Sequence, residues 1–145
     1  MVPGARLFGL DLGEKIIGLA LSDTLLSIAS PFGALKRGKF SANARELLTL
    51  ADEHGVGGLV LGLPLNMDGS EGPSAQSARA FARNLARLTD IPIALWDERL
   101  STAAVTRTLI EADSSRRRRA RVVDKMAAAY ILQGALDRLR AIAPS

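Results

Sequence analysis

The chain has 145 residues, with 19 Lys+Arg, 15 Asp+Glu, one His and no Cys. This is the length of one domain, and we expect residues 1–145 to form a single domain. The absence of cysteine excludes disulfides, thiol nucleophiles and thiolate metal sites, and the lone His54 leaves little room for a zinc site or a Ser-His-Asp triad. If the protein is an enzyme, carboxylates and bound metal are the expected tools, and the net charge of +4 favours a polyanionic partner.

The first third of the chain has the pattern of extended segments. Two apolar runs, Arg6–Asp11 and Ile16–Ser22, are joined by a glycine-containing turn and predict a hairpin. A third extended segment is expected over Ile28–Leu35, although Pro31 and Gly33 interrupt it.

The remaining segments alternate between helical and extended patterns. A helix is expected over Ala42–His54, with Ser41 as its cap, Gly55 as its stop and His54 as a partner of its C-terminal dipole. The later expectations are a buried strand at Gly58–Gly62, a loop at Leu63–Pro73, a helix at Ser74–Leu88, a strand at Ile91–Trp96, a helix from Ser101 or Thr102 to Ala112, an arginine-rich loop, and a helix at Val122–Ile142. Three early strands followed by strand–helix alternation predict an α/β fold with a mixed sheet.

Neither a targeting signal nor a membrane span is expected. Asp11 interrupts the apolar stretch near the N-terminus, which is unlike the core of a signal peptide. The longest uncharged run, Gly55–Met67, is well short of the ~20 residues that a membrane helix needs. We therefore expect a soluble, cytoplasmic protein with no membrane partner.

Three carboxylates stand where an apolar environment is predicted. Asp11 ends an apolar strand, Glu98 follows a buried strand, and Asp124 shares a helix face with apolar residues at Ala128, Ile131, Leu132, Ala135, Leu136 and Leu139. Each also has a structural interpretation: a turn-capping aspartate, an Arg-paired residue at a strand end, and a first-turn acid favoured by the helix dipole.

Taken together, these acids could converge on one edge of the sheet, where open α/β sheets place their sites. Converging carboxylates repel one another unless a cation lies between them. Hard oxygen ligands suit Mg²⁺ or Mn²⁺, and two such ions can promote phosphodiester hydrolysis. That chemistry requires neither cysteine nor histidine.

Four segments resemble the YqgF family, which is RuvX-like and Holliday-junction-resolvase-like: FGLDLGEKIIGLALSD, LVLGLPLNMDGSEGPSAQSARAFARNL, WDERLST and VDKMAAAYILQGALD. The resemblance implies a ribonuclease-H-like fold with a five-stranded mixed sheet flanked by helices. It also implies a metal-dependent nuclease in which Asp11, Glu98 and Asp124 are the catalytic, metal-binding acids. Members are described as maturing the 5′ end of precursor 16S ribosomal RNA, and some as resolving DNA junctions.

The chain departs from the usual family pattern at two places. Glu14-Lys15-Ile16 stands where Thr-Lys-Arg is common, and Lys125 replaces a small residue after the helix aspartate. Neither departure touches the three acids.

Basic and polar residues near these acids are candidates for binding nucleic acid. Residues 101–145 hold nine Lys+Arg against four Asp+Glu, whereas residues 1–100 are nearly neutral. The arginine run is therefore either a solvated loop or a segment that contacts a nucleic-acid backbone through salt-sensitive contacts. The candidate substrate-binding residues are Lys15, Asn66, Ser70, Arg99, Arg116, Arg117, Arg118, Arg119, Arg121 and Lys125.

Some of these candidates have a second interpretation. Asn66 and Ser70 are also ordinary turn formers, and Ser101 or Thr102 could simply cap a helix. Besides a nuclease acting on structured RNA or branched DNA, the sequence is compatible with two other functions. One is a non-catalytic nucleic-acid-binding module, against which the retained acids argue. The other is an actin-like kinase or ATPase, which needs two such domains.

Overall fold

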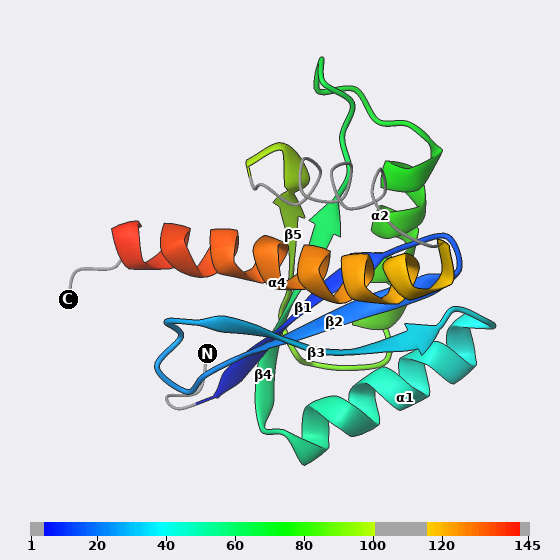
Figure 1. Ribbon diagram of the computed structural model, residues 1–145. Coiled ribbons are helices and arrows are strands. Elements are labelled where there is room, and N and C mark those ends of the chain that lie inside the picture. The colour runs from blue at the N-terminus through cyan, green and yellow to red at the C-terminus, as the bar shows by residue number, and fades with distance from the viewer. Residues whose placement is uncertain (1–4, 101–115, 143–145) are drawn as a thin grey trace.

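The computed structural model describes residues 5–100 and 116–142, with side chains in the last helix described over residues 126–139. Within these residues the chain forms one five-stranded sheet covered by helices on both faces (Figure 1). The elements are β1 (Arg6–Leu12), β2 (Ile16–Ser22), β3 (Ala29–Lys36), α1 (Phe40–Glu53), β4 (Val56–Leu63), α2 (Pro73–Ala86), β5 (Ile93–Asp97), the 3₁₀ turn η1 (Glu98–Leu100) and α4 (Arg116–Ile142).

The strands lie in the order β3-β2-β1-β4-β5. The pairs β1–β2 and β2–β3 are antiparallel, whereas β1–β4 and β4–β5 are parallel. The mixed sheet predicted from the sequence is therefore confirmed. The carboxyl ends of β1, β4 and β5 all lie at the same edge of the sheet, because these three strands run in the same direction.

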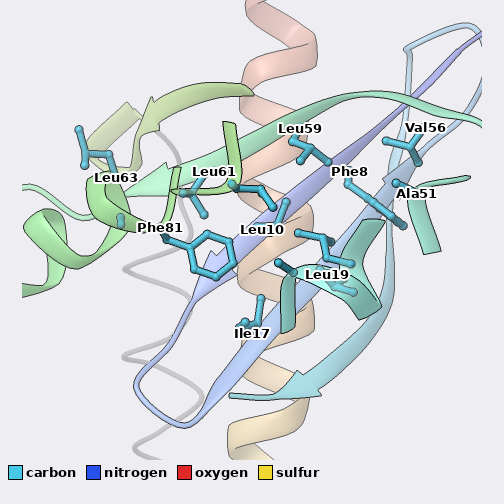
Figure 2. Packing of buried hydrophobic residues seen from close by; sticks show 14 of the residues in the cluster. Phe8, Leu10, Ile17, Leu19, Ala51, Val56, Leu59, Leu61, Leu63 and Phe81 are labelled. Atoms are coloured by element: carbon cyan, nitrogen blue, oxygen red, sulfur yellow. The ribbon is translucent and has the colours of Figure 1, made fainter. Parts of the chain in front are cut away.

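Side chains alternate between the two faces of the sheet and build two separate cores. On one face, Phe8, Leu10 and Leu61 pack with apolar residues of α1 and α2, including Leu47 and Phe81 (Figure 2). On the other face, side chains such as Leu7 and Val60 pack against the middle of α4. Both cores are closed by helices with an apolar stripe, which is the usual layering of an α/β domain.

Strand β3 contains a proline and a glycine, which are residues more typical of loops, and it lies at an edge of the sheet where they are tolerated. Pro31 is within β3, an edge strand, so the N–H that proline lacks is not needed by a second neighbour. The pairing of β2 with β3 shifts between Leu19 and Ala20, because Leu19 pairs with Gly33 and Ala20 with Pro31, so β3 has one extra residue, a bulge, at Phe32.

Two helix starts differ from the prediction by one or two residues. The first helix begins at Phe40, so Ser41 lies inside it and is not its cap. Instead, the buried Asn43 accepts a hydrogen bond from the Gly38 amide through Oδ1 at 2.9 Å. The second helix begins at Pro73, whose fixed φ and missing N–H suit a first helical position. The predicted stop is confirmed, since His54 ends α1 and Gly55 adopts a φ of +66°.

The prediction of an arginine-rich loop is wrong. Helix α4 begins at Arg116, so all five arginines of the run lie in its first two turns. Arginine has a high helix propensity and the run contains neither glycine nor proline, so a periodic apolar face is not needed to start the helix. The expected helix from Ser101 or Thr102 to Ala112 falls outside the described residues. Among the helices described, none is both long and apolar enough to cross a membrane.

Candidate active site

The side chain of Asp11 lies on the face of the sheet that α4 covers. A Cβ built on Gly9 would lie 2.6 Å from Leu132 Cβ and 2.9 Å from the Ala128 carbonyl oxygen, both on α4. Asp11 is two residues further along β1 and therefore points to the same face. It is only 3% exposed, which is unusual for a carboxylate.

Glu98 reaches the same face from the end of the neighbouring strands. It is the first residue of η1, directly after β5, and it is 6% exposed. A Cβ on Gly62 of β4 would lie 3.1 Å from Glu98 Oε2, so the carboxylate occupies the space that a side chain at position 62 would fill. Leu10 pairs with Leu61, which makes Asp11 and Gly62 neighbours one residue further on. Gly62 therefore lies between the two acids.

Asp124 is on α4, four residues before Ala128. Residues separated by four share a helix face, and Ala128 packs directly on β1 at Gly9. The predicted apolar stripe is confirmed over Ala128–Leu136, whereas Leu139 is 39% exposed. The side chain of Asp124 lies outside the described residues, so its role stays a prediction.

An ion pair holds the turn that carries Glu98. Arg99 Nη2 donates to Asp97 Oδ2 at 2.8 Å, Arg99 Nε donates to both carboxylate oxygens at 3.1 Å, and the Arg99 amide donates to Asp97 Oδ1 at 2.9 Å. The side-chain hydrogen bond from Arg99 lowers the pKa of Asp97, and burial only partly opposes this effect. Asp97 thereby fixes the backbone on both sides of Glu98, a role that the sequence analysis did not assign to it.

The loop between β4 and α2 is an internally bonded turn beside Arg99. Asn66 Nδ2 donates to Ser70 Oγ at 3.0 Å, and both the hydroxyl and the amide of Ser70 donate to Asp68 Oδ1. These bonds, the hydroxyl first, lower the pKa of Asp68. Arg99 Nη1 reaches the Met67 carbonyl at 3.3 Å, which ties the loop to η1. The turn-forming interpretation of Asn66 and Ser70 is thus confirmed, and their contact with substrate stays a prediction.

Besides Arg99 in η1, the basic candidates lie in two places. Lys15 is exposed in the turn between β1 and β2. The arginine run and Lys125 lie in the first turns of α4, and their side chains are outside the described residues. A further basic residue, Arg37, which the sequence analysis did not single out, donates from Nη1 to the Gly13 carbonyl in the same turn at 2.8 Å.

The donor set at this edge fits a hard divalent cation. Asp11 and Glu98 provide carboxylate oxygens on one face, at the ends of parallel strands, and oxygen ligands are those that Mg²⁺ and Mn²⁺ prefer. In the part of the chain that the structure describes, no three acidic, histidine or cysteine side chains form a metal-sized group. A third carboxylate would have to come from beyond the described side chains, and Asp124 is the candidate.

Comparison with protein families gives a match along nearly the whole chain. The model of the RuvX family, described as Holliday junction resolvase, matches residues 5–138. The chain belongs to the RuvX family. This confirms the resemblance that the four sequence segments indicate.

Relatives in several bacteria are similar over most of their length. A protein of Paramagnetospirillum magneticum is 70% identical over 132 residues, which are 91% of this chain and 85% of the relative. Proteins of Paracoccus denitrificans and Ruegeria pomeroyi are 64% and 57% identical, over 91% and 95% of this chain and 84% and 90% of theirs. All three carry the name "Putative pre-16S rRNA nuclease".

Solved structures of Thermus thermophilus RuvC have the same fold. The structure of RuvC in complex with a Holliday junction substrate matches with a TM-score of 0.60 at 12% identity, over 96% of this chain and 98% of that one. A second RuvC structure matches with a TM-score of 0.56 at 11% identity, over 94% and 96% of the two chains. The predicted ribonuclease-H-like fold of the RuvX-family chain is thereby confirmed.

Proposed function

We propose that this RuvX-family protein is a metal-dependent endonuclease that hydrolyses phosphodiester bonds in precursor 16S ribosomal RNA. The observation that carries the proposal is the pair of buried carboxylates, Asp11 and Glu98, on either side of Gly62. Two carboxylates on the same side of the sheet repel each other, and a cation bound between them would favour their charged forms. Such a cation would also assist hydrolysis of a phosphodiester. The names of the relatives support RNA as the substrate.

In this proposal Asp11, Glu98 and Asp124 would hold Mg²⁺ or Mn²⁺, and two ions are the number that we infer. Such ions activate a water molecule and stabilise the charge that develops on the phosphate and the leaving oxygen. The protein's own contribution is orientation. The ion pair of Asp97 with Arg99 holds η1 so that Glu98 faces Gly62, and β1 presents Asp11 from the centre of the sheet.

The basic residues around this edge would bind the nucleic-acid backbone. Lys15 lies two residues beyond Gly13 in the turn that follows Asp11, and the arginine run and Lys125 flank Asp124 on α4. Arg116–Arg119 and Arg121 are in helix α4, and consecutive residues of a helix point in different directions around its axis. Only some of these arginines could therefore contact one strand of phosphates. Asn66, Ser70 and Arg99 would act beside them, at the loop between β4 and α2.

A second candidate substrate is a four-way DNA junction. The description of the matching family model, Holliday junction resolvase, favours it.

With either substrate, we propose that residues 1–145 act as one nuclease domain in the cytoplasm. For the RNA activity, we propose a ribosomal precursor particle as the partner.

The experiment compares the two substrates directly. Purified protein is incubated with an end-labelled 5′ segment of precursor 16S RNA and, separately, with a four-way DNA junction, in Mg²⁺, in Mn²⁺ and in a chelator. The variants are Asp11→Asn and Glu98→Gln, and the matched control is Asp52→Asn, which removes an exposed acid on α1.

We expect RNA cleavage that requires metal, falls by at least about 100-fold in both site variants and is unchanged in the control. Binding of the RNA should persist in the site variants, because the basic residues are untouched. Cleavage of the junction alone would move the proposal to the DNA substrate. Binding without cleavage of either substrate by the wild-type protein would favour a non-catalytic binding module.

A further inference from the structure

Arg37 connects three segments at the edge of the sheet where the acids lie. It is the first residue after β3, and its amide donates to the Lys15 carbonyl at 2.9 Å. Its Nη1 donates to the Gly13 carbonyl at 2.8 Å, and its Nη2 donates to Ser77 Oγ on α2 at 2.8 Å. A single half-buried guanidinium therefore links the turn between β1 and β2 to the helix behind it.

The turn that Arg37 holds follows directly from Asp11. The Gly13 amide donates to the Asp11 carbonyl at 3.1 Å and to the Ile16 carbonyl at 2.9 Å. These hydrogen bonds couple the position of Gly13 to the backbone of Asp11. Ser77 belongs to α2, on the sheet face opposite α4, whereas Asp11 points toward α4. Arg37 therefore holds the backbone of the turn from the α2 side of the sheet, and its side chain does not occupy the α4 side, toward which Asp11 points.

The charge of Arg37 does not explain its position. Among the described residues no carboxylate forms an ion pair with it, and both of its side-chain acceptors are neutral oxygens. A positive charge near a cation site lowers the affinity of that site by simple repulsion. The planar fork of arginine does explain the position, because it can donate to two acceptors in fixed directions, which lysine cannot.

We propose that Arg37 is a positioning residue, which clamps the turn between β1 and β2 to α2 and so sets the orientation of Asp11 in the metal site. This inference rests on the proposed nuclease function. It adds a residue that lies far from the acids in sequence and on the other side of the sheet.

The test uses full-length Arg37→Met, Arg37→Lys and Ser77→Ala, with Arg45→Met as the control for losing one positive charge on an exposed face of α1. Three quantities are measured: amide hydrogen exchange of the segment 11–16, the Kd for Mn²⁺, and kcat and KM for the RNA. The first two do not depend on cleavage. They therefore remain decisive if the wild-type protein cuts no RNA and the proposed function fails.

In Arg37→Met we expect the amides of residues 11–16 to exchange about 10-fold faster than in the wild-type protein, and Mn²⁺ to bind several-fold more weakly. We also expect kcat to fall by at least about 10-fold, with KM nearly unchanged. Ser77→Ala should show smaller changes in the same direction, and it provides the test if Arg37→Met does not fold. Arg37→Lys should restore only part of the effect, because one amine cannot reach both acceptors.

Two results would overturn the inference. Tighter Mn²⁺ binding in Arg37→Met with unchanged exchange would show that Arg37 acts only through its charge. A raised KM with unchanged kcat would instead make it a substrate contact.

Discussion

Gly62 and Glu98 fit against each other so closely that a Cβ on the glycine would lie 3.1 Å from Oε2 of the glutamate. The same Cβ would lie 2.6 Å from Cδ1 of Ile131 on α4. The missing side chain at position 62 therefore makes room for a carboxylate under the helix, beside Asp11. Strand β4, helix α4 and η1 meet at Gly62, so a side chain at this position would disturb both the packing of α4 and the position of the Glu98 carboxylate.

We predict that Gly62→Ala lowers activity more than stability. The Ile131 methyl is the end of a flexible side chain and can move aside, so the unfolding free energy should fall by only about 1–2 kcal/mol. Glu98 must move as well, and a displaced ligand should reduce RNA cleavage by at least about 10-fold. Urea unfolding and cleavage rates measure the two effects. Gly38→Ala, where a Cβ meets nothing within 4 Å, is the control, and wild-type cleavage by Gly62→Ala would contradict the prediction.

Gly9→Ala should have the opposite balance and mainly destabilise the fold. Its Cβ would lie 2.6 Å from Leu132 Cβ and 2.9 Å from the Ala128 carbonyl oxygen, groups that cannot move without shifting α4 itself. We expect a loss of about 2–3 kcal/mol in the unfolding free energy, measured by urea denaturation. A loss below that of Gly62→Ala would show that α4 is less tightly held on β1 than the contacts indicate.

The ion pair beside Glu98 should make a pH-dependent contribution to stability. Arg99 lowers the pKa of Asp97 below its ordinary value of 3.8, so the folded state is favoured while this carboxylate is charged. The contribution is present above pH 3.8 and disappears as the pH falls through the lowered pKa. Because Asp97 and Arg99 are partly exposed, we expect only about 0.5–1 kcal/mol.

The measurement is the difference in unfolding free energy between the wild-type protein and Asp97→Asn from pH 7 to pH 3. The difference should be constant near neutrality and shrink on acidification. Asp52→Asn, which removes an exposed acid without an ion pair in the described chain, is the control. A difference that grows toward pH 3 would mean that the sign of the effect is wrong.

Replacing Arg116–Arg119 by glutamine should weaken RNA binding and reduce its salt dependence. Glutamine keeps the helix propensity of these positions, so α4 should remain folded. Each phosphate contact that is lost should lower the slope of log K against log salt by about 0.7–0.9. Fluorescence anisotropy with labelled RNA at several salt concentrations measures this slope.

A second quadruple variant controls for net charge. It replaces four arginines elsewhere on the chain, all with exposed side chains: Arg45, Arg83, Arg87 and Arg138. It should leave the slope nearly unchanged. Equal slopes for the two quadruple variants would return the arginine run to the role of a solvated surface.

The sequence determined the order and type of most elements, because local patterns suffice for that. Apolar runs such as Ile16–Ser22 match the strand bounds, and Gly55 ends its helix where expected. Prediction from local sequence failed where charge and helix propensity favour different structures for the same segment. The arginine run reads as a loop by charge but is helical by propensity, and the start of α4 follows propensity.

The candidate acids were also found from local context, since a carboxylate at the end of an apolar segment is unusual in any fold. Only the tertiary structure decided that Gly62 separates Asp11 from Glu98 and that Arg37 reaches Gly13. These relationships join residues tens of positions apart. They depend on strand order and register, which arise from packing the whole chain at once and leave no periodic signal in the sequence.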